Sequence, residues 1–546
     1  MNSIFGIIDN NNQSFEDRLK RMLDFNDIEL YRDTGVIFSL NWSVRRNLSL
    51  LNKKNFANRD DLDKGGVCFI GTTGMVPFYG EGQRFILVFN GNIWNYSTLR
   101  SDMEKVGHYF KTDDHGEVVL HRIEESYKHS SSLVAAVSDT LKELDGVFVF
   151  MFLDRGERTA VLARDPVGVK QLHYVNHYTF VGFSSKRKHF WNLGLKPVRL
   201  LPGELIEIKE DKKNDGYTTK NHDLNSIKPN KISITDEATA VKRYKEVLFE
   251  AVRKRIEGNR KIGVIFSGGV DSVMIAQVVR ELGVEITCYT AGISGASDLM
   301  YARKAAEALG FTLRVNRLTE EIISEDLKQI IAAVESTNHL QIDAATPVYF
   351  ATKLASEDGV KVLLNGQGPD ELFAGYSWYP HVLLERGGAH LNACLWNDLK
   401  NGYKETFERE ENIAKYYGID LRMPYVDPRV IDVAMSISEE LKIKNGTVKY
   451  LHRKLAEYLG IPEFIAWRPK EAAQHGSNIH ETLRDVIFKS RKEISEENLK
   501  QFAGKILAFK VREKLGSVYR YHQDIYSEDK EVQEILDYIG AELDVY

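Results

Sequence analysis

Hydrophobic and polar positions along the chain change their pattern near residue 235. Before that point, short β-prone runs alternate with turn signals and with three helical stretches, which predicts an α+β domain with stacked sheets. After it, helical stretches alternate with short buried strands, the pattern of an α/β domain with a parallel sheet. The stretch 209–234 is polar and lacks periodicity, so it is predicted to be a linker. We therefore expect domains at 1–208 and 235–546.

A glycine turn follows the first strand predicted for the second domain. The strand spans 262–266, and a helix opens at Asp271 directly after the turn. Free backbone N–H groups at such a turn, together with the positive end of the helix dipole, bind phosphate. Asp271 would repel phosphate unless a cation such as Mg²⁺ lay between them. The phosphate-binding candidates are Ser267, Gly268, Gly269 and Ser272.

A second glycine turn lies farther along the same domain. It follows the strand predicted at 360–364 and reads Asn-Gly-Gln-Gly-Pro-Asp-Glu at 365–371. Ligands of an open α/β sheet bind at the carboxyl ends of its strands, near a topological switch point. Two glycine turns at such ends, each followed by an aspartate, predict one site built from both.

Composition and charge exclude several classes of protein. With 546 residues, 43% hydrophobic and 28% charged, the chain can form two or more ordinary cores. A net charge of −5 and the lack of a long basic run give no reason to expect nucleic acid. No apolar run is long enough for a membrane span, and the N-terminus does not resemble a signal peptide. Three scattered cysteines predict neither disulfides nor a cysteine zinc site, so we expect a cytoplasmic protein.

Six motifs in these two halves resemble the asparagine synthetase family, in its order and at about its spacing. They cover nearly the whole chain, and the form of the second turn is most similar to archaeal-type members and to the eukaryotic asparagine synthetase domain-containing protein. The resemblance implies an Ntn-hydrolase-like (αββα) glutamine amidotransferase type 2 domain, then a PP-loop ATP pyrophosphatase (adenine nucleotide alpha hydrolase-like) domain. The motifs are NGNIWNY at 90–96, ARDPVGVKQLHY at 163–174, SGGVDS at 267–272, GQGPDELFAGY at 366–376, IDLRMPYVD at 419–427 and WRPKEA at 467–472.

The resemblance implies a chemistry and assigns residues to it. Family members join the aspartate side chain to AMP with release of pyrophosphate, and ammonia then displaces the AMP. By residue match, Asp271 and Asp370 are expected to bind Mg²⁺, and Lys470, or else Lys449, to stabilise charge at the α-phosphate of ATP. Glu371 is expected on the substrate side together with Asp370. The positions that match the nucleotide pocket are Phe266, Ala291, Asn365 and Gly366.

The first domain departs from the family where glutamine would be hydrolysed. The family nucleophile is a cysteine directly after the initiator methionine, whereas Asn2 has no nucleophile. The family carboxylate of NGE is lost at Asn92, and His115 stands at the position of the glutamine-binding aspartate. We predict a domain without glutaminase activity, and the source of ammonia, free or from a separate subunit, stays open. The vestigial site comprises Asn2, Asn90, Gly91, Asn92 and His115.

The second domain departs from the family at two positions. Gln367 replaces a glutamate that is tied to acyl-adenylate formation in bacterial members, although archaeal-type members share the glutamine. Asp343 aligns with an arginine that contacts aspartate in many members. A reversed charge at this position would repel a substrate carboxylate, which weakens the case for aspartate as the substrate.

Three functions remain open on the sequence alone. The first is an ammonia-using asparagine synthetase with a silent glutaminase domain. The second is a carbapenam- or β-lactam-synthetase-like or peptide-cyclising ligase, in which Glu408 would support a general base; Glu408 is otherwise one charge among several in ETFEREEN. The third is a non-catalytic binding protein, against which the complete phosphate turn argues. A homodimer is expected only from the family.

Overall fold

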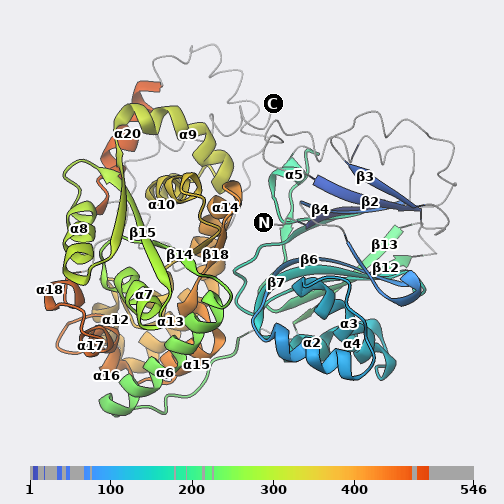
Figure 1. Ribbon diagram of the computed structural model, residues 1–546, viewed down its shortest axis with the longest axis horizontal. Helices are drawn as coiled ribbons and strands as arrows, with labels where there is room; N and C mark the ends of the chain where they lie inside the picture. Colours follow the sequence, from blue (N-terminus) through green and yellow to red (C-terminus); the bar gives the residue numbers. More distant parts are fainter. Residues whose placement is uncertain are drawn as a thin grey trace. The chain divides into compact units, whose positions relative to one another are not determined.

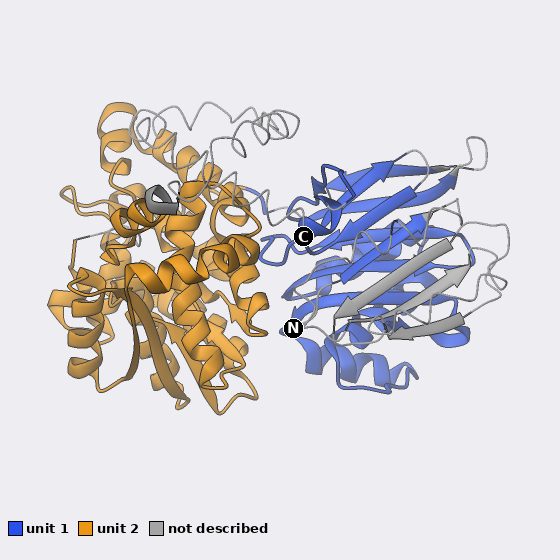
Figure 2. Ribbon diagram, turned by 90° about the horizontal axis from the view of Figure 1, so that it is seen from above, with its two compact units in different colours: residues 1–228 blue, residues 229–546 orange. Residues whose placement is uncertain are grey.

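The computed structural model describes the chain in segments, which form two compact units at 1–228 and 229–546 (Figure 2). Each unit is considered by itself. Among the described residues, no helix combines the length and the apolar character that a membrane crossing requires. The described segments are 4–9, 18, 33–39, 45–49, 67–73, 77–177, 180–191, 193–211, 216–223, 227–469 and 476–490.

The first unit contains two antiparallel sheets. The seven-stranded sheet has the order β11-β9-β10-β1-β4-β2-β3, and the six-stranded sheet has the order β13-β12-β8-β7-β6-β5. The first sheet comprises β1 (Ile4–Asp9), β2 (Asp33–Ser39), β3 (Arg45–Ser49), β4 (Val67–Thr73), β9 (His173–His177), β10 (Phe180–Ser184) and β11 (Val198–Arg199). The second comprises β5 (Phe78–Tyr79), β6 (Phe85–Ile93), β7 (Gly146–Asp154), β8 (Thr159–Arg164), β12 (Glu204–Asp211) and β13 (Gly216–Asp223).

Strand β7 shows why these layers form. All nine of its residues are buried. Val149 and Met151 pack in a core with residues of the other sheet, such as Ile4 and Phe183. The alternate residues, such as Phe150, pack in a second core with the helices. Side chains alternate between the two faces of a strand, so a strand that is apolar throughout needs cover on both. The covering helices are α2 (Tyr96–Lys105), α3 (His115–Lys128) and α4 (Leu133–Glu143) (Figure 1).

The predicted linker at 209–234 contains regular structure. Strand β12 continues to Asp211, and β13 (Gly216–Asp223) pairs with it in an antiparallel register from Asp211–Gly216 to Glu204–Asp223. Strand β13 lies at the edge of its sheet, so water can satisfy the backbone groups along its unpaired edge and a polar stretch can form the strand without an apolar pattern. This part of the linker prediction is therefore wrong.

The second unit is built on a five-stranded parallel sheet with the order β16-β15-β14-β17-β18. Its strands are β14 (Lys261–Ile265), β15 (Glu285–Ile293), β16 (Thr312–Leu318), β17 (Val362–Leu364) and β18 (Asp420–Arg422). Strands β15 and β16 follow β14 on one side of it in the sheet, and the later strands β17 and β18 lie on the other side of β14. The switch point therefore lies between β14 and β17, the place where such sheets bind ligands.

Helices surround this sheet (Figure 1). Those that position the site are α7, which begins at the first glycine turn, α8 and α10, which pack against β15, and α14 and α17. The helices of the unit are α6 (Glu237–Ile256), α7 (Val270–Glu281), α8 (Ser297–Leu309), α9 (Glu320–Val334), α10 (His339–Glu357), α11 (Pro369–Leu372), α12 (Tyr379–Arg386), α13 (Gly388–Gly402), α14 (Glu408–Tyr416), α15 (Pro428–Ser436), α16 (Glu439–Lys442), α17 (Tyr450–Tyr458), α18 (Glu463–Ala466) and α20 (Ile479–Ser490).

Candidate active site

The first glycine turn joins β14 to α7. Gly268 has a φ of 72°, and a Cβ atom there would lie 2.4 Å from the backbone nitrogen of Ala302 in α8. Only glycine fits this close approach. Ser272 Oγ donates to the carbonyl oxygen of Gly269 at 3.1 Å and lies 3.4 Å from Ser267 Oγ. Both hydroxyls therefore lie at the N-terminal end of α7, beside its free backbone N–H groups.

We expect the Gly268→Ala variant to be destabilised by about 1–3 kcal/mol, because the new methyl group meets backbone atoms that cannot swing aside. Urea unfolding measures the change. Gly283→Ala is the matched control: Gly283 has a φ of 79° but no atom within 4 Å of the new methyl group. An equal loss of unfolding free energy in the two variants would show that the contact with α8 contributes nothing and that backbone strain accounts for the whole loss.

The second glycine turn follows β17 and lies against the first. A Cβ atom at Gly366 would lie 3.1 Å from the backbone of Asp271 and Ser272. The two turns meet because β14 and β17 are neighbours in the sheet. Asp370 comes from the start of α11, so the structure brings the two predicted carboxylates to the same edge.

Lys449 joins these two carboxylates. Its Nζ atom lies 2.7 Å from Asp271 Oδ2 and 2.9 Å from Asp370 Oδ1, and its side chain is 1% exposed. The Lys449 backbone has a φ of 55°, a left-handed conformation that costs free energy and occurs often at functional sites. His452 Nε2 approaches Asp271 Oδ1 at 3.0 Å, and burial lowers the pKa of this histidine. Gly375 leaves the space for Asp370 and Lys449.

A cavity of about 160 Å³ opens between the two turns. It is also lined by Arg468, Pro469 and Arg453, which were not among the predicted site residues. The Arg468 guanidinium binds Asp298 at 3.0 Å and stacks on Tyr301 at 3.8 Å. The predicted residues in the lining are Phe266, Ser267, Gly269, Asp271, Ser272, Ala291, Asn365, Gly366, Gln367, Asp370 and Lys449.

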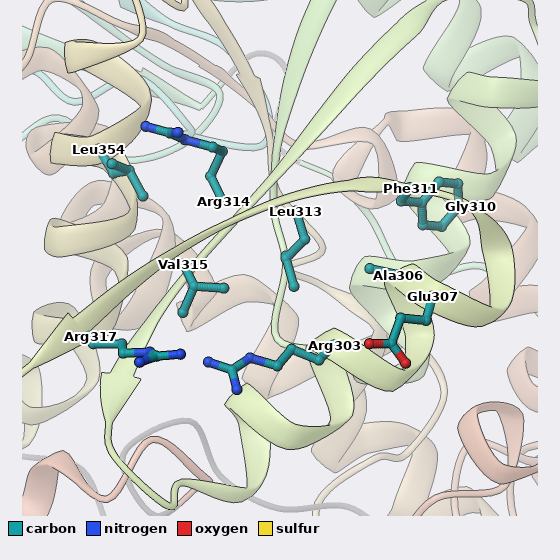
Figure 3. A pocket seen from close by; sticks show the side chains of 10 residues that line it. All are labelled: Arg303, Ala306, Glu307, Gly310, Phe311, Leu313, Arg314, Val315, Arg317 and Leu354. Atoms are coloured by element: carbon teal, nitrogen blue, oxygen red, sulfur yellow. The ribbon is translucent and has the colours of Figure 1, made fainter.

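A larger hollow of about 780 Å³ lies along the edge strand β16 (Figure 3). Arg303 and Arg317 extend into the same part of it (Figure 3), and Arg314 pairs with Asp358 at 3.0 Å. It is lined by neither glycine turn and by none of the predicted site residues. The smaller cavity is therefore the candidate active site, because the predicted phosphate-binding turns and both carboxylates converge on it.

Glu410 supports the second turn, although it was not among the predicted site residues. Its carboxylate accepts hydrogen bonds from Gln367 Nε2 at 2.7 Å and from the side-chain amide of Asn365. Arg409 approaches the same carboxylate at 3.1 Å. Glu410 is fully buried, and this burial raises its pKa. The sequence ETFEREEN pointed to Glu408 but gave no way to choose among its glutamates, since each step along a helix turns the side chain by about 100°.

The remaining predicted substrate residues are buried beside the cavity. Asp343 is not among the lining residues and binds His480 Nδ1 of α20 at 2.6 Å. Glu371 accepts a hydrogen bond from Tyr376 at 2.5 Å, and burial together with the charge of Asp370 raises its pKa to about 7. Lys470 lies outside the described residues and directly follows Pro469, which lines the cavity.

Comparisons with known proteins agree with this architecture. The asparagine synthase family model matches residues 243–389 and 383–536, and the glutamine amidotransferase domain model matches 70–192. The Methanocaldococcus jannaschii protein named Putative asparagine synthetase (glutamine-hydrolyzing) 1 is 30% identical over 89% of this chain and 92% of its own. The chain belongs to the asparagine synthetase family. It is therefore an ATP-dependent ligase with an Ntn-hydrolase-like domain and a PP-loop domain, which confirms the predicted fold class.

Other asparagine synthetases match over less of their length. The Gallus gallus enzyme is 30% identical over 71% of this chain and 72% of its own. Among solved structures, the glutamine phosphoribosylpyrophosphate amidotransferase of B. subtilis is 16% identical over 57% of this chain and 65% of its own, with a TM-score of 0.31.

The described residues of the vestigial glutaminase site make structural contacts within the first unit. Asn90, Gly91 and Asn92 lie in β6, and Asn90 is 4% exposed. His115 begins α3, accepts a hydrogen bond from the backbone N–H of Ile93 at 2.7 Å, and stacks on Tyr96 with ring centroids 4.8 Å apart. The ring therefore joins β6 to α3. Asn2 lies outside the described residues.

Proposed function

We propose that this family member makes asparagine from aspartate, ammonia and ATP through an aspartyl-AMP intermediate. An oxygen of the aspartate side chain attacks the α-phosphorus of ATP, and the bond to the β-phosphate oxygen breaks, so pyrophosphate leaves. Ammonia then attacks the acyl carbon, loses a proton, and AMP leaves with the former carboxylate oxygen. The observation that carries this proposal is the convergence of both glycine turns, Asp271, Asp370 and Lys449 on one cavity.

The two carboxylates have the chemistry that Mg²⁺ requires. Hard oxygen ligands suit this ion, and Asp271 and Asp370 already share one cationic group, the Lys449 ammonium, at 2.7 and 2.9 Å. When bound, Mg²⁺ would neutralise charge on the departing pyrophosphate. Backbone N–H groups of 267–272 would hold that pyrophosphate.

Lysines and amides of the cavity would complete the site. Lys449 is held at the carboxylates, and Lys470 is proposed to reach the α-phosphate. Gln367 donates its Nε2 to Glu410, which leaves its side-chain carbonyl oxygen able to accept a hydrogen bond from ammonia. An amide at this position would orient the nucleophile without acting as its base. Phe266 and Ala291 would line the nucleotide pocket.

The charge of Asp343 is the strongest objection to aspartate as the substrate. His480 binds this carboxylate at 2.6 Å, and Asp343 is 5% exposed. This contact holds the Asp343 carboxylate against α20, and Asp343 does not line the cavity, so its charge is not presented directly to a substrate carboxylate there. Arg468 lines the cavity but already pairs with Asp298 at 3.0 Å. Arg453 also lines it and donates to backbone carbonyls, so its guanidinium is the cation proposed to suit an amino acid carboxylate.

We further propose that the domain at 1–208 does not hydrolyse glutamine, and that the domain at 235–546 carries the synthetase reaction alone. We expect ¹⁵N from ammonium to enter asparagine, and ¹⁵N from the side-chain amide of glutamine to stay out, because Asn2 supplies no thiolate. Mass spectrometry of the product, with AMP and pyrophosphate measured in parallel, checks this. Release of glutamate from glutamine above background, if the Asn2→Ala variant abolished it, would contradict the proposal for the first domain. The synthetase proposal would not be affected.

A further inference from the structure

Two histidines and a glutamate of the first unit meet in its interior. His108 lies in the loop between α2 and α3, and His121 and Glu124 lie on one face of α3. The three side chains are buried at 8%, 5% and 6% exposure. The distance between the two Nδ1 atoms is 3.1 Å, and Glu124 Oε2 lies 2.8 Å from His121 Nδ1 and 4.0 Å from His108 Nδ1.

These three atoms face one another with too few protons to satisfy them. A neutral histidine carries one ring proton. If His121 keeps its proton on Nδ1, that proton is shared between Glu124 and His108. If it moves to Nε2, Glu124 Oε2 loses this donor. In the structure His121 Nε2 is buried and has no hydrogen-bond partner, a costly arrangement in a protein interior.

The Nε2 atoms of both histidines point away from the cluster toward carboxylates. A proton on Nε2 leaves Nδ1 of the same neutral ring without one, and so able to bind a metal ion. His108 Nε2 lies 3.1 Å from Glu125 Oε2, and His121 Nε2 lies 3.8 Å from Glu117 Oε1. The His108 ring therefore has a carboxylate at hydrogen-bond distance behind it, as metal-binding histidines do, and the Glu117 carboxylate lies farther from the His121 ring. Glu124 Oε1 accepts the backbone N–H of Glu81 at 3.1 Å, which leaves Oε2 turned toward the histidines.

We propose that His108 Nδ1, His121 Nδ1 and Glu124 Oε2 bind one divalent transition-metal ion of the zinc class. Ligand atoms around tetrahedral Zn²⁺ are spaced by about 3.3 Å, which follows from Zn–N bonds of about 2.0 Å, and the three observed separations bracket this value. Imidazole donors favour zinc-class ions over Mg²⁺ or Ca²⁺. With the metal bound, both Nδ1 atoms are ligands, and both Nε2–H groups face carboxylates.

The ion would fasten the loop between α2 and α3 to α3 itself. Its role is structural, and it is independent of the synthetase site in the second unit. Because binding needs the folded arrangement of a loop residue and two helix residues, the free energy of binding would add to the stability of the first unit.

Metal analysis of the full chain, purified with its affinity tag removed, tests the proposal. We expect about one zinc per chain by inductively coupled plasma mass spectrometry, and less than a tenth of that in His121→Ala and in Glu124→Gln. Glu124→Gln is the variant least able to disturb the fold, because its amide oxygen still accepts from Glu81. Glu125→Gln should weaken zinc binding by about 10- to 100-fold. His381→Gln, at a side chain 63% exposed in the second unit, is the control and should keep its zinc.

A second measurement separates metal loss from misfolding. After chelation, Co²⁺ added to the parent chain should produce the visible absorption of a tetrahedral site, and Zn²⁺ should raise the melting temperature; Glu124→Gln should show neither. A chain that retains no metal, gives no Co²⁺ absorption and melts at the same temperature with Zn²⁺ would overturn the proposal and leave a hydrogen-bonded cluster. Equal zinc in the parent chain and in Glu124→Gln would overturn it too.

Discussion

The Asp271→Asn variant should lose about 1000-fold in the rate of aspartate-dependent ATP–pyrophosphate exchange while it stays folded. The substitution keeps the shape of the side chain and removes the charge that holds Lys449 at 2.7 Å and that is proposed to bind Mg²⁺. Loss of one preorganised charged contact to a transferring phosphate group costs about this much. Exchange of labelled pyrophosphate into ATP at saturating aspartate measures the effect.

A matched carboxylate provides the control for Asp271. Asp326 binds Lys353 at 2.5 Å in the same unit but does not line the cavity. Asp326→Asn should exchange at the rate of the parent chain, and circular dichroism should show both variants folded. Exchange in Asp271→Asn within a few-fold of the parent would contradict the assignment of this carboxylate to the adenylating site.

The Glu410→Gln variant should separate the two halves of the reaction. Glu410 is proposed to position Gln367 and Asn365 without touching the substrate. In Glu410→Gln the remaining amide oxygen can still accept from Asn365 in the nucleotide pocket, whereas the amide nitrogen cannot accept from Gln367, so pyrophosphate exchange should stay within about threefold of the parent. Asparagine formation should fall by about 10- to 100-fold, with a higher KM for ammonia, because the Gln367 amide would no longer be held in one orientation. Steady-state kinetics with varied ammonium measure this difference.

A purely structural role for Glu410 predicts something else. Both half-reactions would then fall together, and the KM for ammonia would not change. Glu405→Gln is the control, since Glu405 lies in the preceding helical turn and contacts Gln341 at 3.5 Å. It should behave as the parent does in both assays.

Strong local patterns explain what could be predicted from the sequence. The turn at 267–269 and the strand before it were predictable because an apolar run followed by serine and two glycines is typical of a strand that ends in a phosphate-binding turn. Asp370 and Lys449 were candidates through resemblance, and the structure adds that one ammonium joins both carboxylates. Parallel strands buried on both faces also stand out as apolar runs, which revealed β14 and β17.

Features that depend on tertiary packing could not be predicted. Strand β18 (Asp420–Arg422) has one apolar residue between two charged ones and so gives no apolar run, and β13 is polar because it lies at an edge. Glu410 and Glu408 are equivalent in a charged run until the orientation of α14 is known. The cluster of His108 with His121 depends on the path of a loop, and the cysteine count gave no hint of it.

ATP–pyrophosphate exchange by the parent chain, with Mg²⁺ and a panel of carboxylic acids, tests directly whether the cavity forms an acyl-AMP and from which acid. We expect exchange to rise with aspartate to saturation and to be weak with glutamate. It should require neither glutamine nor ammonia. Exchange with a different acid and none with aspartate would contradict the assigned substrate. No exchange with any acid would contradict the adenylating site itself.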